Sequence, residues 1–277
     1  MTDVTTATGI DHAPRPVLSS RHRPTPPGAL PTVLVFGWRA LLRLKHIPSQ
    51  AFDVTMFPLI LLVMFTYLFG GALTGSTRVY LQSVLPGLLV MTIVMTTQST
   101  GVALNSDITK GIFDRFRSLP IWQPAALAGA LLADLGRYAI SATVIVSVGT
   151  LLGFRPGAGL PGLALGVGLV LLFAWSLSWV WTGIGLVISA PESMMFLGMM
   201  VTFPLTFVSN VFVDPATLPG WLEGFVNVNP ITHLVTAVRG LMHGDPVGTE
   251  VGWVLLTCAV LVGVCAPVAM RLYRRER

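Results

Sequence analysis

Residues 160–189 read LPGLALGVGLVLLFAWSLSWVWTGIGLVIS, a run of 30 residues without one charged side chain. A helix needs about 20 predominantly apolar residues to cross the roughly 30 Å of hydrocarbon in a bilayer, so this stretch predicts a membrane-spanning helix. The whole chain has the same apolar character. Of its 277 residues 10% are charged, against about 25% in an ordinary soluble domain, and its mean hydropathy is +0.76. These values argue against a cytosolic enzyme, a nucleic-acid-binding domain and a disordered chain.

Five further apolar runs flank this stretch and are long enough to be spans, at residues 54–73, 84–104, 125–154, 193–213 and 251–270. The predicted fold is therefore an all-α integral membrane protein with six transmembrane helices, built from residues 31–277. Residues 1–30 are polar and rich in proline, with six prolines in residues 1–32, and they are expected to form a disordered cytoplasmic tail rather than a signal peptide.

The distribution of basic residues predicts the orientation of the six spans. An even number of spans places both termini on one side of the membrane, and 14 of the 17 lysines and arginines fall on that side, against three on the other. Because loops rich in lysine and arginine stay in the cytoplasm, both termini are predicted to be cytoplasmic. The net charge of +5 is explained in this way without a nucleic-acid partner.

Ionisable groups inside the predicted spans are scarce, and two of them share one helix. Asp134 and Arg137 lie three residues apart in the third span, so their side chains project from the same helix face and can pair. We interpret them as a structural ion pair rather than a proton relay.

Two segments outside the spans also have ordered patterns. Residues 30–47 carry apolar side chains together with the basic side chains of Arg39, Arg43 and Lys45, which predicts an amphipathic helix on the cytoplasmic membrane surface. The long connection 214–250 is apolar for an exposed loop and contains a short helical pattern at 231–242, so we expect it to fold back against the bundle.

Motifs for catalysis are missing from the sequence. It contains no G-x-S-x-G, no H-E-x-x-H and no phosphate-binding G-x-x-x-x-G-K-[ST], and none of its five histidines pairs with another at metal-ligand spacing. We therefore assign no catalytic residue, no metal ligand and no nucleotide site to this chain.

The connection between the second and third spans mixes charged and large apolar side chains. Phe113, Phe116 and Leu119 recur every three residues and lie along one face of a predicted helix. An apolar ridge on a charged helix suits docking into a groove of a partner protein, and it suits equally a helix that rests among lipid headgroups. The residues alone favour neither interpretation.

Two motifs resemble those of the ABC type-2 exporter permeases, most closely the daunorubicin/doxorubicin-resistance group. The first is the sequence GIFDRFRSLP at residues 111–120. The second is spread over the outer connection, as VDP at 213–215, LPGW at 218–221, VNPITH at 228–233 and RG at 239–240. The resemblance extends over nearly the whole chain apart from the N-terminal tail.

This resemblance implies how the chain works with its partners. Such permeases are homo- or heterodimers of six-span subunits in the cell membrane, surrounded by lipid. Each subunit binds a separate cytoplasmic ABC ATPase through a coupling helix before the third span, and that ATPase carries the ATP and Mg²⁺. The resemblance also implies short re-entrant helices between the fifth and sixth spans. On this chain the coupling helix corresponds to Gly111, Phe113, Asp114, Arg115, Phe116, Arg117, Leu119 and Pro120.

The expected function is export of an apolar drug or lipid-like molecule, powered by ATP binding on the partner. Candidate residues of the translocation pathway come from the second and fifth spans: Thr96, Gln98, Met195, Met199 and Phe203. Methionine adapts its shape to varied apolar cargo. The alternatives are a permease for polysaccharide or another glycoconjugate, and, in a different class, an intramembrane lipid-modifying enzyme.

The predicted orientation is testable by cysteine labelling in a variant whose native Cys258 and Cys265 are replaced by alanine. A cysteine at Thr249 should react with a membrane-impermeant reagent from outside intact cells, because its loop is predicted to lie outside. A cysteine at Arg274 should react only after the cells are permeabilised. The reverse pattern of labelling would overturn the orientation.

Overall fold

The computed structural model describes residues 35, 48–111, 124–212 and 219–275. Within these residues the chain forms eight helices. Their bounds are α2 Pro48–Thr74, α3 Thr77–Thr109, α5 Pro124–Leu151, α6 Gly159–Val187, α7 Pro191–Phe207, α8 Gly220–Val228, α9 Pro230–His243 and α10 Gly248–Arg275. The N-terminal tail, most of the predicted amphipathic helix 30–47 and residues 112–120 of the predicted coupling helix lie outside the described residues.

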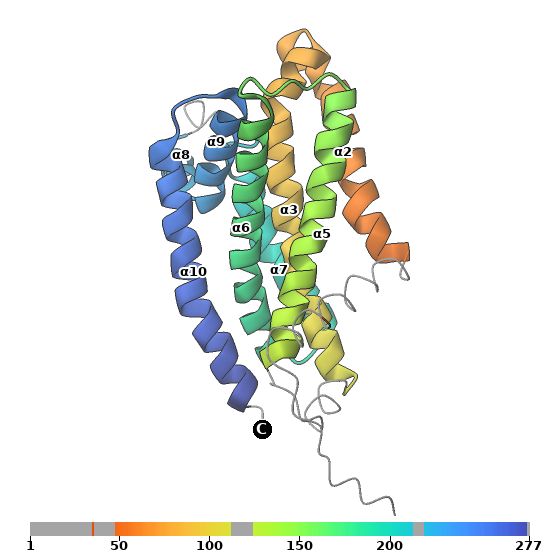
Figure 1. The fold of residues 1–277 in the computed structure, drawn as a ribbon, viewed down its shortest axis with the longest axis vertical. Coiled ribbons are helices and arrows are strands. Elements are labelled where there is room, and N and C mark those ends of the chain that lie inside the picture. Colours follow the sequence, from red (N-terminus) through yellow and green to blue (C-terminus); the bar gives the residue numbers. More distant parts are fainter. Residues whose placement is uncertain (1–34, 36–47, 112–123, 213–218, 276–277) are drawn as a thin grey trace, which may run out of the picture.

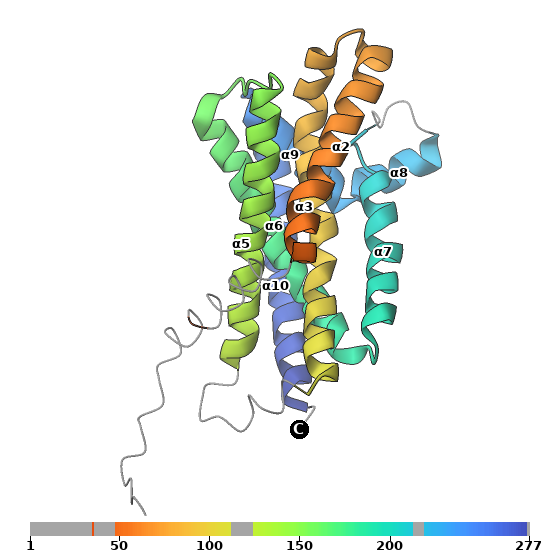
Figure 2. The same ribbon diagram turned by 90° about the vertical axis from the view of Figure 1, so that its right-hand side faces the viewer.

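The long helices run up and down one bundle, and the short helices α8 and α9 lie in its upper half (Figure 1). We call the end that holds the C-terminus the lower end; α3, α6 and α10 finish there, and α5 and α7 begin there. Helix α7 stands at one side of α3, and α8 projects sideways near the top of α7 (Figure 2).

Helix α3 is the centre of the bundle. It contacts α2, α5, α6, α7 and α9. In an 18-residue stretch of its span 72% of the residues are buried, against 11% in such a stretch of α10, which lies at the periphery. The helix with the most hydroxyl and amide side chains is therefore the one most fully surrounded by protein.

Among the residues that the structure describes, five helices are long and apolar enough to cross a membrane: α2, α3, α5, α6 and α10. They correspond to the predicted spans 54–73, 84–104, 125–154, 160–189 and 251–270. The predicted fifth span, 193–213, is represented by α7, which has only 17 residues. An all-helical protein with several spans is confirmed, whereas the count of six is not.

Helices α3 and α7 differ in extent from the predicted spans, for different reasons. Helix α3 begins at Thr77 and ends at Thr109 instead of covering 84–104, because polar side chains at its ends remain helical even though they lower the hydropathy. Helix α7 ends at Phe207, six residues before the predicted end at 213. The carbonyl of Val208 accepts a hydrogen bond from the side chain of Asn229, a donor that lies outside the helix.

The predicted end of the third span at 154 also lies beyond the helix. Gly153 has a φ of 108°, a left-handed conformation that favours glycine, and the helix stops at Leu151. The amides of Gly153 and Phe154 donate to the carbonyls of Thr150 and Gly149, which satisfies two acceptors at the end of α5.

The connection after α7 folds back against the bundle, as its apolar composition predicts. The expected short helix 231–242 is α9, Pro230–His243, which contacts α3, α6 and α10. Its fully buried side chains include Leu234, Val235 and Val238. Asn229 caps its first turn by accepting a hydrogen bond from the amide of Ile231 at 3.0 Å.

Helices α3 and α6 cross closely at two glycines. A methyl group on Gly101 would lie 2.7 Å from the carbonyl oxygen of Trp181, and one on Gly185 would lie 2.8 Å from the carbonyl oxygen of Gly101. Beside this crossing the indole of Trp181 donates to Thr97 Oγ1 at 2.9 Å. Small residues let membrane helices approach until their backbones touch, and Gly101 and Gly185 allow this between α3 and α6.

We expect Gly101→Ala to destabilise the protein by about 1–3 kcal/mol, because backbone atoms block the new methyl group and the helices must separate. Gly183→Ala in α6 is the matched control, since nothing lies within 4 Å of a methyl group there. Thermal unfolding of the purified proteins in detergent should show a lower midpoint for the first variant only. Equal midpoints for the two variants would contradict the close crossing.

Candidate functional site

Helix α7 buries one narrow side and exposes the other. Proline at its first turn suits a helix start because its missing N–H has no helical partner there. Its buried residues repeat every four positions, at Met194, Gly198, Thr202 and Thr206, and this side faces α3.

The opposite side of α7 carries three of the predicted pathway residues, one helical turn apart. Met195, Met199 and Phe203 are 56%, 58% and 49% exposed. The structure thus brings these three together on one apolar surface, as their spacing of four residues predicts.

Phenylalanine rings continue this surface from α7 to α2. Phe203 stacks on Phe207 with ring centroids 4.1 Å apart, and Phe207 lies 5.7 Å from Phe212. Phe212 in turn stacks on Phe65 of α2 at 4.6 Å, and Phe65 lies 5.3 Å from Phe69. We call these five rings the aromatic row. Sequence reasoning did not find the row, because it joins α2 to residues of α7 more than 130 positions away.

The two predicted pathway residues of α3 are not part of this exposed surface. Gln98 packs against α7, with its side chain next to Gly198, and its Oε1 is buried. Thr96 is half-buried, and its hydroxyl donates to the carbonyl of Thr92 in its own helix at 2.7 Å. Gln98 therefore lies behind the α7 surface, at the contact between the two helices.

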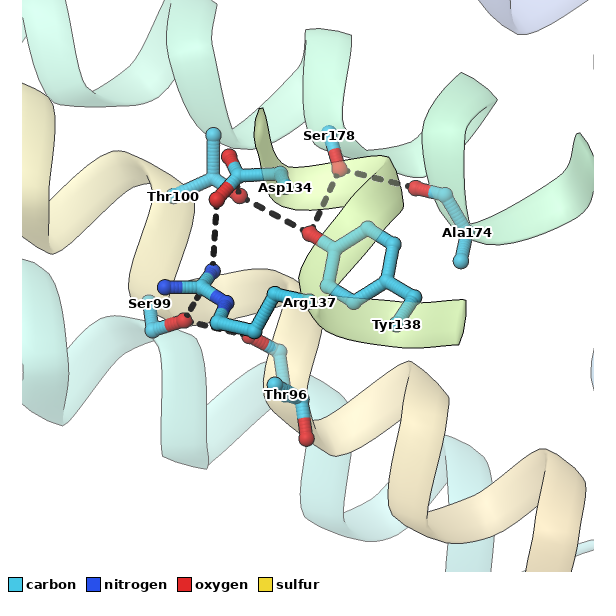
Figure 3. A network of polar contacts seen from close by, with 8 residues as sticks. All are labelled: Thr96, Ser99, Thr100, Asp134, Arg137, Tyr138, Ala174 and Ser178. Carbon is cyan, nitrogen blue, oxygen red and sulfur yellow. Dashed lines mark hydrogen bonds and ion pairs between the residues drawn. The ribbon is translucent and has the colours of Figure 1, made fainter. Parts of the chain in front are cut away.

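Separate from this apolar surface, a group of polar residues lies inside the bundle, where α3, α5 and α6 meet (Figure 3). Arg137 Nη2 lies 2.8 Å from Asp134 Oδ1, and the two side chains are 12% and 13% exposed. The ion pair predicted from their spacing is confirmed. Arg137 also donates to Ser99 Oγ at 2.7 Å, and Asp134 Oδ2 accepts from Thr100 Oγ1 at 2.7 Å.

The network continues through Tyr138 to α6. The Tyr138 hydroxyl lies 2.9 Å from both Thr100 Oγ1 and Ser178 Oγ, and Ser178 donates to the carbonyl of Ala174 at 2.8 Å. Figure 3 shows the tyrosine oxygen between the hydroxyls of α3 and α6. Tyr138 is fully buried, so this chain of hydrogen bonds ties three helices together in the protein interior.

Tyr138 and Ser178 were missed by the sequence analysis. The available signal was weak: Tyr138 lies four residues after Asp134 and so shares its helix face. Its partners lie 38 and 40 residues away, and no sequence spacing indicates such contacts.

The predicted coupling helix is represented in the described residues by Gly111 alone. Its φ is 65°, and its amide donates to the carbonyl of Ile108 at 2.9 Å, directly after the end of α3. The other seven predicted coupling residues lie outside the described part of the chain and stay a prediction.

Within the described ranges, no group of three or more histidine, cysteine, aspartate or glutamate side chains is placed to hold a metal ion. At the upper end, His233 Nδ1 lies 2.6 Å from Glu250 Oε2, which links α9 to the start of α10. His243 Nδ1 donates to the carbonyl of Arg239 at 2.7 Å. Both histidines have partners within the protein, whereas their sequence context suggests only surface solvation.

Comparisons with known proteins agree with this architecture. The model of the ABC-2 type transporter family matches residues 32–243. The chain is 47% identical over 273 residues to the daunorubicin resistance ABC transporter permease protein DrrB1 of Streptomyces coeruleorubidus. The aligned region covers 99% of this chain and 96% of that protein. It is 26% identical over 183 residues, 65% of each chain, to the probable doxorubicin resistance ABC transporter permease protein DrrC of Mycobacterium tuberculosis.

The structural interpretation of the ion pair predicts how its variants behave. Arg137→Leu should cost about 3–5 kcal/mol of stability, because it leaves the Asp134 carboxylate buried without its cation. Replacing both Asp134 and Arg137 by leucine should recover much of that loss, since neither charge then remains to be desolvated. Thermal unfolding of both purified variants measures the difference, and a double variant no more stable than Arg137→Leu would contradict the interpretation.

Proposed function

The chain belongs to the ABC-2 type transporter family, and we propose that it is the membrane permease subunit of an ABC exporter that moves apolar, drug-like molecules out of the cytoplasm. The observation that carries this proposal is the 47% identity, along almost the entire chain, to a daunorubicin resistance permease. The matched family model covers the bundle from before α2 to the end of α9.

The exposed side of α7 supports the choice of cargo. Its methionines and the aromatic row offer flat and adaptable apolar surfaces, and both suit a planar aromatic drug. We infer that Met195, Met199 and Phe203 contact the substrate. In this proposal Gln98 supports α7 from behind, and Thr96 belongs to the internal packing of α3.

We infer that α7 is the fifth of six spans. Its 17 residues rise about 25 Å, close to the hydrocarbon thickness, and the non-helical residues after Phe207 continue toward the upper end. Six spans, together with the excess of basic residues on one side, support a cell-membrane protein with both termini in the cytoplasm.

The partners of the permease follow from the same proposal. A second permease copy, identical or different, completes the pathway by covering the exposed apolar side of α7, and lipid surrounds the remaining outer helices. A separate cytoplasmic ABC ATPase binds residues 111–120 and holds the ATP and Mg²⁺. ATP binding then closes the ATPase pair and displaces the helices next to this segment, so that access to the pathway alternates.

Two alternatives have weaker support. Export of a polysaccharide or glycoconjugate is compatible with the aromatic row, since sugars stack on rings. Glu192 and Ser193 are exposed in the first turn of α7, but its other exposed side chains are methionine, phenylalanine, valine and proline, which offer no hydrogen bonds to sugar hydroxyls. A lipid-modifying enzyme requires clustered acids or histidines at one membrane face, and neither the sequence motifs nor the similar proteins support that chemistry.

The proposed coupling helix is tested by Phe116→Asp. If the ring anchors the permease in an apolar groove of the ATPase, a carboxylate there is left without a partner and should abolish co-purification of the ATPase. Membrane levels of the variant should be normal, because Phe116 lies outside every predicted span. Daunorubicin export should be lost together with ATPase binding.

The matched control is Arg115→Ala in the same segment. A charge at the rim of an interface contributes little to affinity, so this variant should keep most of its ATPase. A Phe116→Asp protein that retains both the ATPase and export would show that this segment does not couple the two subunits.

A further inference from the structure

Two buried asparagines from elsewhere in the chain bind the last carbonyls of α6 and of α7. At the lower end Asn105 of α3 donates from Nδ2 to the carbonyl of Gly185 at 3.0 Å and to the carbonyl of Ile188. At the upper end Asn229 donates from Nδ2 to the carbonyls of Leu205 and Val208, at 2.7 and 2.8 Å.

The two asparagines make the same pair of contacts. Each carboxamide reaches the carbonyl of a C-cap residue, Ile188 of α6 or Val208 of α7, and the carbonyl three residues before it. These carbonyls belong to the last turn of a helix, where no further helical N–H is available. Asn105 and Asn229 are 2% and 3% exposed, so no water is available to replace them as donors.

Asn105 lies between the lower end of α3 and the residues that lead into α7. It is four residues before the end of α3 at Thr109 and six before Gly111, the first residue of the proposed coupling segment. On the other side its acceptor Ile188 is three residues before Pro191, where α7 begins. One side chain therefore joins the end of α3 to the end of α6, three residues before α7 begins.

At its lower end α7 packs mainly against α3. Its start is joined to α6 through residues 188–190, and the exposed side carries Met195 and Met199. Its buried residues near this end are Met194, whose methyl group lies close to Gly101 of α3, and Gly198, next to Gln98 of α3. The position of this part of α7 is thus set from α3.

We propose that Asn105 is a positioning residue for transport, which transmits displacement of the lower end of α3 to the start of α7 through the carbonyl of Ile188. This inference rests on the proposed function, in which the ATPase acts on residues 111–120. The bond stays closed during the cycle, because opening it leaves two buried carbonyls without a donor. The substrate-facing side of α7 then turns with α3 rather than independently of it.

The first test is Asn105→Leu, which keeps the size of the side chain and removes its donors. The variant is reconstituted with its ATPase in liposomes, and the daunorubicin moved per ATP hydrolysed is measured per folded complex. We expect that ratio to fall roughly ten-fold while ATP hydrolysis continues, the scale on which links between sites alter coupling. A purely structural role would instead lower folded protein, hydrolysis and export together, and that outcome overturns the proposal.

Thr109→Val is the matched control. Thr109 lies one turn further along α3, and its hydroxyl donates only to the carbonyl of Asn105 within the same helix. This variant should keep the wild-type ratio of export to hydrolysis. A loss equal to that of Asn105→Leu would assign the effect to the end of α3 in general and would count against Asn105.

A second test does not depend on how well Asn105→Leu folds. Cysteines replace Asn105 and Ile188 in a variant with Cys258→Ala and Cys265→Ala, and a short, reducible bifunctional thiol reagent joins them. The linked protein should transport with a restored ratio of export to hydrolysis, and reduction with dithiothreitol should lower that ratio again. Transport that stops on linking and returns on reduction would show that the contact must open, which overturns the proposal.

The same measurements separate this inference from the proposed function. A wild-type complex that hydrolyses ATP without moving daunorubicin overturns the proposed function, and the role of Asn105 falls with it. A wild-type complex that exports daunorubicin, alongside an Asn105→Leu complex with the same ratio, overturns the role of Asn105 alone.

Discussion

In a bilayer the backbone polar groups of each helix, its last carbonyls included, need partners inside the protein, and the arrangement of this bundle depends on that constraint. Helix α3 carries the greatest number of hydroxyl and amide side chains, and it is also the helix with the largest buried share. Its Thr97 accepts from Trp181, its Thr100 joins Asp134 and Tyr138, and its Asn105 binds carbonyls of α6. Any other rotation of α3 would take these groups away from the partners that they have here.

The same constraint separates the interior from the transport surface. Charged and hydroxyl side chains are used between α3, α5 and α6, whereas the outside of α7 beyond its first turn exposes only methionine, phenylalanine, valine and proline. The polar network fixes the angle between three helices and leaves no polar group on the surface proposed to meet the cargo. A permease for apolar drugs needs both features: helices held at fixed angles, and a surface without polar groups that require hydrogen-bond partners.

Helix ends pose the sharpest form of the problem, because the last carbonyls of a helix have no partner within it. The bundle solves this in two ways. At the end of α5 a left-handed glycine, Gly153, turns the backbone so that its own amides reach back. At the ends of α6 and α7 the side chains of Asn105 and Asn229 do so from other helices, which also fixes where α7 stands.

Features that depend on one helix at a time could be predicted from the amino-acid sequence. Hydropathy located five long spans, the spacing of Asp134 and Arg137 predicted their ion pair, and the pattern at 231–242 predicted α9. The four-residue spacing of Met195, Met199 and Phe203 placed them on one side of α7, and two loop motifs indicated the family. Only the tertiary structure decided which way each helix faces, and with it the roles of Gln98, Tyr138, Ser178, Asn105 and the aromatic row. Contacts within a helix follow from its 3.6-residue turn, whereas contacts between helices depend on the rotation and depth of each one, which its own sequence does not specify.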